Sequence, residues 1–328
     1  YNDGSLQPSA PVGRNLIING NMAINQRGSA SYDITGAVYT LDRYRGGASI
    51  ASKFSIAQGT TTPPAGFTNY LQVTSSASTT IGSTNSYSFF QRVEGYNVAD
   101  LNWGTSDAQT VTMSFWVRST LTGTFGGKLQ NSAQNRIYIF SYTISSANTW
   151  EKKTITVTGD TTGTWLTTNG VGLSINFSVG AGSGKEATAG SWGTDNIPIQ
   201  PTGSTNVVAT SGATWQITGL QLEAGTTATP FEHLQYGTQL ALCQRYFEVV
   251  DTGSANAAYG TPGAVSSGRV GYISYTYNTS KRANPTVVMA SGGTLSTLQT
   301  AGLNVASAYA STDIYPRFNP GSTFSSEL

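Results

Sequence analysis

Short runs in which apolar and polar residues alternate make up much of the chain. In "VTMSFWV" (111–117) every second residue is apolar, so these side chains share one face of a β-strand. "IYIFSYTI" (137–144) is largely apolar on both faces, as in a strand that is covered on both sides. Further strands are predicted at 16–28, 39–47, 151–159, 170–180 and 213–223. Many short strands separated by turn residues favour an all-β fold, a large jelly-roll β-sandwich.

Helical spacing first occurs in "LQYGTQLALCQRYF" (234–247), which predicts one short helix around 236–245. Alternating β-type segments resume after it. We therefore expect a smaller C-terminal β domain behind the large sandwich. The predicted organisation is a polar linker (1–14), a jelly-roll domain (15–232), a short helical connector (233–245) and a small β domain (246–328).

The composition narrows the possible partners. Charged residues make up 10% of the chain, and the net charge is +1. A surface that binds nucleic acid needs a dense Lys/Arg stripe, so no nucleic-acid partner is expected. No run is apolar enough for membrane insertion, and the polar N-terminus looks like the end of a linker within a longer or processed chain. Hydroxyl and amide side chains must supply the polar surface, and these pair well with sugars.

Three stretches together resemble a jelly-roll domain of bacteriophage virion proteins, such as tail fibres and head fibres. They are "NLIINGNMAINQRG…YTLDRY" (15–44), "VTMSFWVRS" (111–119) and "WQITGLQLEAGTTATPFEHLQYGTQLALCQRYF" (215–247). That domain is similar to the carbohydrate-binding-module type of β-sandwich. The resemblance implies a structural protein on the virion surface, homo-oligomeric and often trimeric, in contact with other virion proteins. It implies no enzyme and no cofactor.

The resulting hypothesis is a virion appendage protein that adheres to host or environmental glycans or to a host receptor. One alternative is a purely architectural head-decoration or fibre protein without a ligand. The other is a polysaccharide-degrading enzyme, which needs two facing carboxylates. No spacing in the sequence indicates such a pair.

The only histidine and the only cysteine, His233 and Cys243, are ten residues apart. Cys243 lies among apolar neighbours, and free cysteine is usually buried, so we predict a structural pair and no catalytic residue. Asn19, Asn21 and Glu223 occupy stretches where related sandwiches hold calcium. Ordinary hydrogen bonding by Glu223 or Glu232 is the simpler expectation, so no metal site is predicted.

Two tryptophans lie in loops without an alternating pattern to bury them. Trp103 follows Asn102, and Trp192 precedes Asp195 and Asn196. An aromatic ring beside amide and carboxylate groups can bind the C–H face and the hydroxyls of a sugar. We predict a glycan site at these five residues. The alternatives are loops folded back onto the sandwich and burial at a subunit contact.

The tyrosines of "GYISYTYN" form a second candidate surface. Tyr275 and Tyr277 share one strand face, and Tyr272 lies on the other. Because tyrosine is common at interfaces, these residues are predicted to contact a receptor or a second protomer.

Overall fold

The computed structural model describes residues 14–250, 261–262, 273–274, 277–288 and 322–325. These residues form two compact units that meet in sequence at Gln239 and Leu240. The α-helix α1 (Tyr236–Gln244) confirms the short helix predicted around 236–245. The predicted domain limits themselves stay a prediction. No helix in the described ranges is long and apolar enough to cross a membrane.

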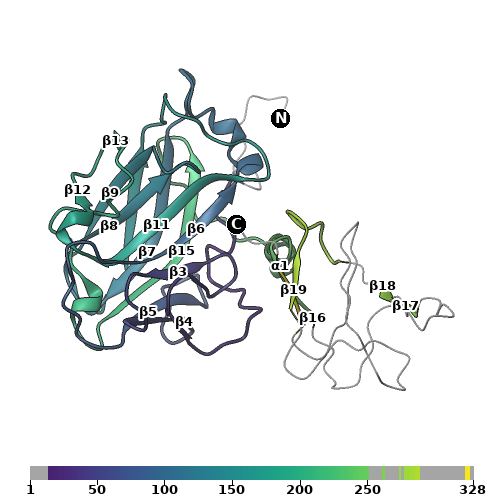
Figure 1. Ribbon diagram of the computed structural model, residues 1–328, viewed down its shortest axis with the longest axis horizontal. Helices are drawn as coiled ribbons and strands as arrows, with labels where there is room; N and C mark the ends of the chain where they lie inside the picture. Colours follow the sequence, from purple (N-terminus) through teal and green to yellow (C-terminus); the bar gives the residue numbers. More distant parts are fainter. Residues whose placement is uncertain (1–13, 251–260, 263–272, 275–276, 289–321, 326–328) are drawn as a thin grey trace. The chain divides into compact units, whose positions relative to one another are not determined.

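The first unit is a sandwich of two β-sheets whose ladders are antiparallel (Figure 1). One sheet has six strands, in the order β1 (Tyr32–Asp33), β4 (Phe54–Gly59), β5 (Tyr70–Ser75), β15 (Thr214–Ala224), β7 (Val111–Ser119) and β10 (Glu151–Val157). The other has seven, in the order β13 (Trp192–Gly193), β9 (Ile137–Ile144), β8 (Gly123–Gln130), β11 (Val171–Ala181), β6 (Ser86–Glu94), β3 (Arg45–Ala48) and β2 (Val38–Tyr39). The all-β prediction is confirmed.

Short elements complete both units. The first unit also contains the parallel pair β12 (Glu186–Ala187) and β14 (Gln200–Pro201), and the 3-10 helices η1 (Gly95–Asn97), η2 (Ala99–Leu101), η3 (Ser183–Lys185) and η4 (Val207–Ala209). The second unit contains a three-stranded sheet of β16 (Phe247–Val250), β20 (Ser322–Ser325) and β19 (Thr286–Val288), and the pair β17 (Thr261–Pro262) and β18 (Ile273–Ser274).

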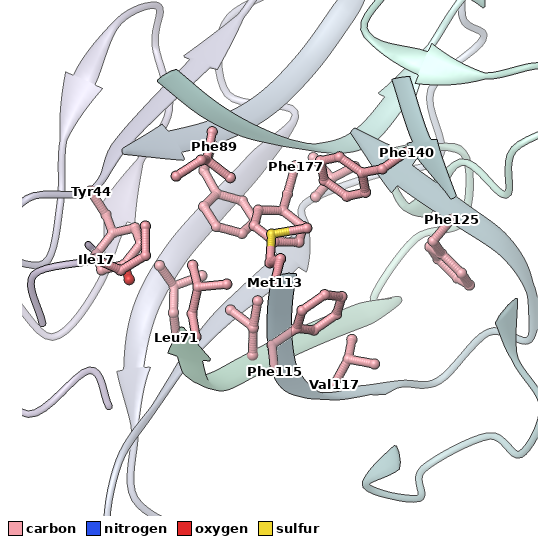
Figure 2. Close-up of a cluster of buried hydrophobic side chains, with 14 of the residues drawn as sticks. Ile17, Tyr44, Leu71, Phe89, Met113, Phe115, Val117, Phe125, Phe140 and Phe177 are labelled. Atoms are coloured by element: carbon pink, nitrogen blue, oxygen red, sulfur yellow. The ribbon is translucent and has the colours of Figure 1, made fainter. Parts of the chain in front are cut away.

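Aromatic side chains fill the space between the two large sheets. Figure 2 shows Phe89, Phe140 and Phe177 of the seven-stranded sheet facing Met113 and Phe115 of the six-stranded sheet. The ring of Phe177 lies 5.3 Å from that of Phe89 and 5.4 Å from that of Phe115. The apolar positions of β7 thus face the core, as its alternating sequence predicts.

The prediction of a strand at 16–28 is wrong, because this segment consists of turns and irregular backbone. Asn19 and Met22 have φ values of 60° and 58°, in the left-handed region that interrupts a strand. The Asn19 side chain closes the turn by accepting a hydrogen bond from the Ile24 N–H (2.9 Å) and donating one to the Ile24 carbonyl (2.9 Å). A short amide side chain that bonds to nearby backbone competes with strand pairing.

A segment from β12 to β14 covers part of the outer face of the seven-stranded sheet. A Cβ atom added at Gly126 of β8 would lie 2.6 Å from Pro201, so glycine permits this close approach. Ile137 and Ile139 of β9 are buried although they lie outside the main core, and Gly190 donates its N–H to the Ile139 carbonyl. The rest of this sheet face carries polar and aromatic side chains.

Candidate functional site

The two tryptophans predicted to bind sugar meet in one aromatic cluster. The rings of Trp103, Trp165 and Trp192 pack edge to face, with centroid distances of 4.7, 5.3 and 5.4 Å. This is a favourable geometry for aromatic pairs. The indole N–H of Trp103 donates to the Gln109 carbonyl (2.7 Å), and that of Trp192 to the Thr158 carbonyl (2.7 Å). The cluster therefore holds three loops together at one end of the sandwich.

The expectation that Trp103 is an accessible loop side chain is wrong. Its exposed fraction is 7%, and it belongs to the main hydrophobic core, because its loop folds back onto the sandwich. Trp192 is partly buried and packs against that core. The assignment of both residues to glycan binding stays a prediction.

A cavity of about 230 Å³ lies beside Trp103 and Trp165. Asn102, another predicted site residue, also lines it, in a left-handed conformation (φ 53°). The other residues that line the cavity are mainly apolar. Since ligand pockets usually measure about 300–1,000 Å³, this cavity is small for a chain of sugars.

A second arrangement of polar and aromatic side chains lies on the outer face of the seven-stranded sheet. Cross-strand register aligns five side chains that alternate with core residues, and we call them the outer row. In order they are Tyr39 (β2), Arg45 (β3), Phe90 (β6), Asn176 (β11) and Lys128 (β8). Neighbouring strands are about 4.8 Å apart, so the row spans roughly 19 Å of sheet.

Next to the outer row, register aligns Arg92, Ser174 and Gln130 on the same face. Asn176 and Gln130 have exposed fractions of only 8% and 9%. Even so, Asn176 Oδ1, Gln130 Oε1 and Arg45 Nε have no hydrogen-bond partner among the described residues. Buried polar atoms in folded proteins are nearly always hydrogen-bonded, so these three atoms are open to an ordered water or a ligand.

Arginine and aromatic side chains interleave at one end of this face. The Arg45 guanidinium lies 5.1 Å from the ring centre of Tyr39 and 6.0 Å from that of Phe90. Arg92 lies 5.2 Å from the Phe90 ring centre. Burial lowers the pKa of Arg92, and the nearby Arg45 charge adds to that lowering, whereas Tyr39 opposes it. Two guanidinium groups are thus held close together around one phenyl ring.

Lys128 forms the other end of the outer row. Its exposed fraction is 5%, and its ammonium donates a long hydrogen bond (3.4 Å) to the carbonyl of Asn196. Burial lowers the pKa of Lys128 to about 8; the Lys185 charge adds to the lowering, and Asp195 opposes it. The predicted residues Asp195 and Asn196 therefore lie beside the outer row. Their assignment to glycan binding stays a prediction.

Replacing Lys128 with methionine tests this buried charge. Between pH 8 and 10.5 the unfolded lysine holds its proton and the folded one loses it, so the wild-type free energy of unfolding rises with pH in that window. We expect Lys128→Met to be more stable than the wild type at pH 7. That difference should shrink by roughly 1 kcal/mol at pH 9, as measured by urea unfolding. A difference that stays constant or grows would contradict the lowered pKa.

The histidine and the cysteine each have structural surroundings of their own. The His233 ring packs against Phe67 (5.4 Å) and Phe231 (4.9 Å). Cys243 is fully buried in α1, as predicted for a structural cysteine. These contacts are typical of packing residues.

Of the predicted tyrosine surface, Tyr277 lies within the described residues. Its ring centre is 5.1 Å from the Lys281 ammonium, and burial, aided by the Glu248 charge, raises the pKa of its hydroxyl. Tyr272 and Tyr275 lie outside the described residues. A receptor or protomer contact at these residues stays a prediction.

Glu223 and Glu232, the carboxylates considered above beside a calcium site, form hydrogen bonds with protein groups. Glu223 accepts hydrogen bonds from the Thr229 N–H (2.9 Å) and hydroxyl (2.6 Å), and Glu232 accepts one from the Asn15 N–H (2.9 Å). The ordinary hydrogen bonding expected of these carboxylates is confirmed. In the part of the chain that the structure describes, no group of three or more His, Cys, Asp or Glu side chains could hold a metal ion.

The sequence interpretation missed the outer row. One signal was available: in "GLSINFSVG" (172–180), polar Ser174, Asn176 and Ser178 alternate with apolar residues. The pattern identifies a polar strand face. It does not reveal that this face is buried or which strands lie beside it.

No protein-family model matches this sequence, and no curated protein matches it. Among solved structures, the enzymatically active domain of tailspike protein 4 of bacteriophage CBA120 is similar over 65% of this chain, with a TM-score of 0.37 and 11% identity. The match covers 22% of that tailspike chain.

Carbohydrate-binding modules are also among the similar structures. TmCBM61, solved in complex with beta-1,4-galactotriose, is similar over 65% of this chain and 99% of its own, with a TM-score of 0.34 and 10% identity. The N-terminal cellulose-binding domain of Cellulomonas fimi beta-1,4-glucanase C is similar over 67% of this chain and 100% of its own, with a TM-score of 0.31 and 14% identity. The sugars named here are ligands of those proteins.

Proposed function

We propose that this protein is a non-catalytic, glycan-adhesive component of a bacteriophage virion appendage. The virion assignment is supported by the sequence resemblance over residues 15–247. The glycan assignment is supported chiefly by one observation, the unsatisfied buried polar atoms of Asn176 and Gln130 beside an aromatic ring on a sheet face.

The chemistry of this face suits a sugar. A pyranose presents C–H groups that pack on an aromatic ring and hydroxyls that both donate and accept hydrogen bonds. Phe90 supplies a partly exposed ring, and Asn176 Oδ1 and Gln130 Oε1 are acceptors for hydroxyl donors. Strand pairing fixes the backbone positions of these residues before a ligand arrives, which reduces the entropy lost on binding, and a small side-chain movement exposes the two buried amide oxygens to the sugar.

Two carboxylates near the proposed site support a non-catalytic role. Glycosidic hydrolysis needs two carboxyl groups about 5–9.5 Å apart, both able to reach the bond. Glu94 lies on the same face of β6 as Phe90, but its exposed fraction is 1%. Asp160, at the tryptophan-cluster end, accepts hydrogen bonds from Nε and Nη2 of Arg136.

Adhesion by this protein depends on many weak sites acting together. We take the protein to be a homo-oligomer, often trimeric in this type of appendage, displayed on the virion surface. Several copies per appendage raise the effective concentration of each site, so a weak single site suffices for attachment.

A glycan-array screen of the purified full chain tests the proposal. Phe90→Ala is expected to weaken binding to the best glycan about tenfold, since the ring supplies the stacking surface. Tyr96→Ala is the matched control, because Tyr96 is an aromatic residue of the same unit with an exposed fraction of 62%. Its binding should equal that of the wild type.

The remaining outcomes separate the alternatives. Binding to no glycan would support a purely architectural protein. Release of new reducing ends from a bound glycan would support a polysaccharide-degrading enzyme. Equal losses in Phe90→Ala and Tyr96→Ala would place the site elsewhere.

A further inference from the structure

The outer face of the seven-stranded sheet concentrates positive charge in a protein that is nearly neutral overall. The whole chain has 17 Lys and Arg against 16 Asp and Glu. Arg45, Arg92 and Lys128 nevertheless lie together on one face, and Lys185 is close enough to Lys128 to affect its pKa. The ion pairs found among the described residues involve none of the first three.

Holding these cations here without a direct ion pair lowers the stability of the fold, and Asp195 offsets only part of this cost at Lys128. Lys128 is almost completely buried with one long hydrogen bond, although an ammonium can donate three. Arg92 is partly buried beside the like charge of Arg45, whose Nε has no partner. Unpaired buried charges are rare in proteins, and groups arranged against stability are typical of binding sites.

The spacing of the charges indicates an extended ligand. The backbone positions of Arg45 and Lys128 lie three strands apart on the outer row, which is about 14 Å, with Phe90 and Asn176 between them. A single small anion cannot reach both ends. A chain that carries repeated anionic groups on a sugar backbone can do so while packing on the ring between them.

Building on the glycan binding proposed above, we propose that the outer row binds an anionic glycan. Its carboxylate or sulfate groups pair with Arg45 and Arg92 at one end and with Lys128 at the other. A sugar ring lies on Phe90, and sugar hydroxyls donate to Asn176 Oδ1. Arginine suits this role because its planar fork forms two parallel hydrogen bonds with such oxyanions.

The first test uses the wild-type full chain and chemically matched probes. Oligogalacturonate is compared with the same oligomer after complete methyl esterification, which removes the charge and keeps the sugar backbone. Dextran sulfate is compared with dextran in the same way. Calorimetry should show at least tenfold tighter binding to one or both acidic probes, and weaker binding as sodium chloride is added. The two pairs distinguish carboxylate from sulfate as the preferred anion.

The second test asks whether Arg45, Arg92 and Lys128 are the residues that bind the anionic groups. The Arg45→Gln/Arg92→Gln variant and Lys128→Met should each lose about tenfold or more in affinity for the preferred acidic probe. Lys128→Met should do so while its unfolding midpoint rises at pH 7, a combination that a purely structural lysine does not give. Lys152→Gln, at an exposed position of β10, is the control and should bind like the wild type.

Failure of this inference is distinguishable from failure of the proposed function. If array-positive neutral glycans bind and neither acidic probe does, or if acid and ester bind equally, the anionic preference is overturned and the adhesin remains. If no glycan binds, the anionic preference and the proposed adhesive function are both contradicted. If the variants lose acidic and neutral binding equally, the cations have no charge-specific role. The comparison of acidic with neutral probes uses only the wild-type protein, so it still tests the anionic preference if a variant fails to fold.

Discussion

Replacing Trp103 with alanine is expected to lower the free energy of unfolding by about 3–5 kcal/mol. The side chain is 7% exposed, packs edge to face on Trp165 and Trp192, and already borders a cavity of about 230 Å³. Its removal would enlarge that cavity and leave the Gln109 carbonyl without its indole donor. Both effects act on the loops at one end of the sandwich.

Urea unfolding followed by tryptophan fluorescence measures this loss. All 6 tryptophans belong to the first unit, so the signal reports the sandwich alone. Tyr96→Ala, at an exposed aromatic position on the neighbouring η1, should change stability by less than about 0.5 kcal/mol. A Trp103→Ala variant as stable as Tyr96→Ala would show that the cluster contributes nothing to the fold, and would restore the case for Trp103 as a sugar platform.

Asp160→Ala is expected to cost about 3 kcal/mol, near the lower end for breaking a buried ion pair. Asp160 accepts hydrogen bonds from Arg136 Nε (2.6 Å) and Nη2 (2.7 Å) and from the Thr162 N–H (3.1 Å). Its side chain is 2% exposed and that of Arg136 is 16% exposed, so water recovers part of the loss on the arginine side. The alanine leaves a guanidinium without its carboxylate.

A double-mutant comparison separates the ion pair from packing. Because Arg136→Met removes the stranded charge, the Asp160→Ala/Arg136→Met variant should recover part of the stability lost in Asp160→Ala. The same urea titration provides both values. A loss below about 1 kcal/mol in the single variant, or no recovery in the double variant, would mean that the pair does not hold this end of the sandwich.

The alternation of apolar and polar residues predicted the sandwich, because alternation within a single strand already shows which face of that strand is buried. The apolar positions of 111–117 face the core. One face of the strand at 137–144 packs on the core, and on its other face the segment that ends at β14 covers Ile137 and Ile139, whereas Ser141 and Thr143 are exposed. The short helix was also predictable, since a break in strand alternation is local. Turns stabilised by side chains were less visible: Asn19 closes a turn within 16–28, where the apolar pattern alone favours a strand.

The candidate site depends on pairing between distant segments, which no local pattern contains. Phe90, Asn176 and Lys128 become neighbours only through the register of β6, β11 and β8. Trp103 shows the complementary error: a loop without alternation looked exposed, but tertiary aromatic packing buries its ring. Residue types that suit sugars were recognisable in the sequence, whereas their arrangement was not.

A crystal structure of the full chain with the tightest-binding glycan from the array tests the central claim most directly. We expect a sugar ring stacked on Phe90, with sugar hydroxyls donating to Asn176 Oδ1 and Gln130 Oε1. Sugar density confined to the cavity beside Trp103, or lying on the six-stranded sheet, would contradict the assignment of the outer row as the binding surface.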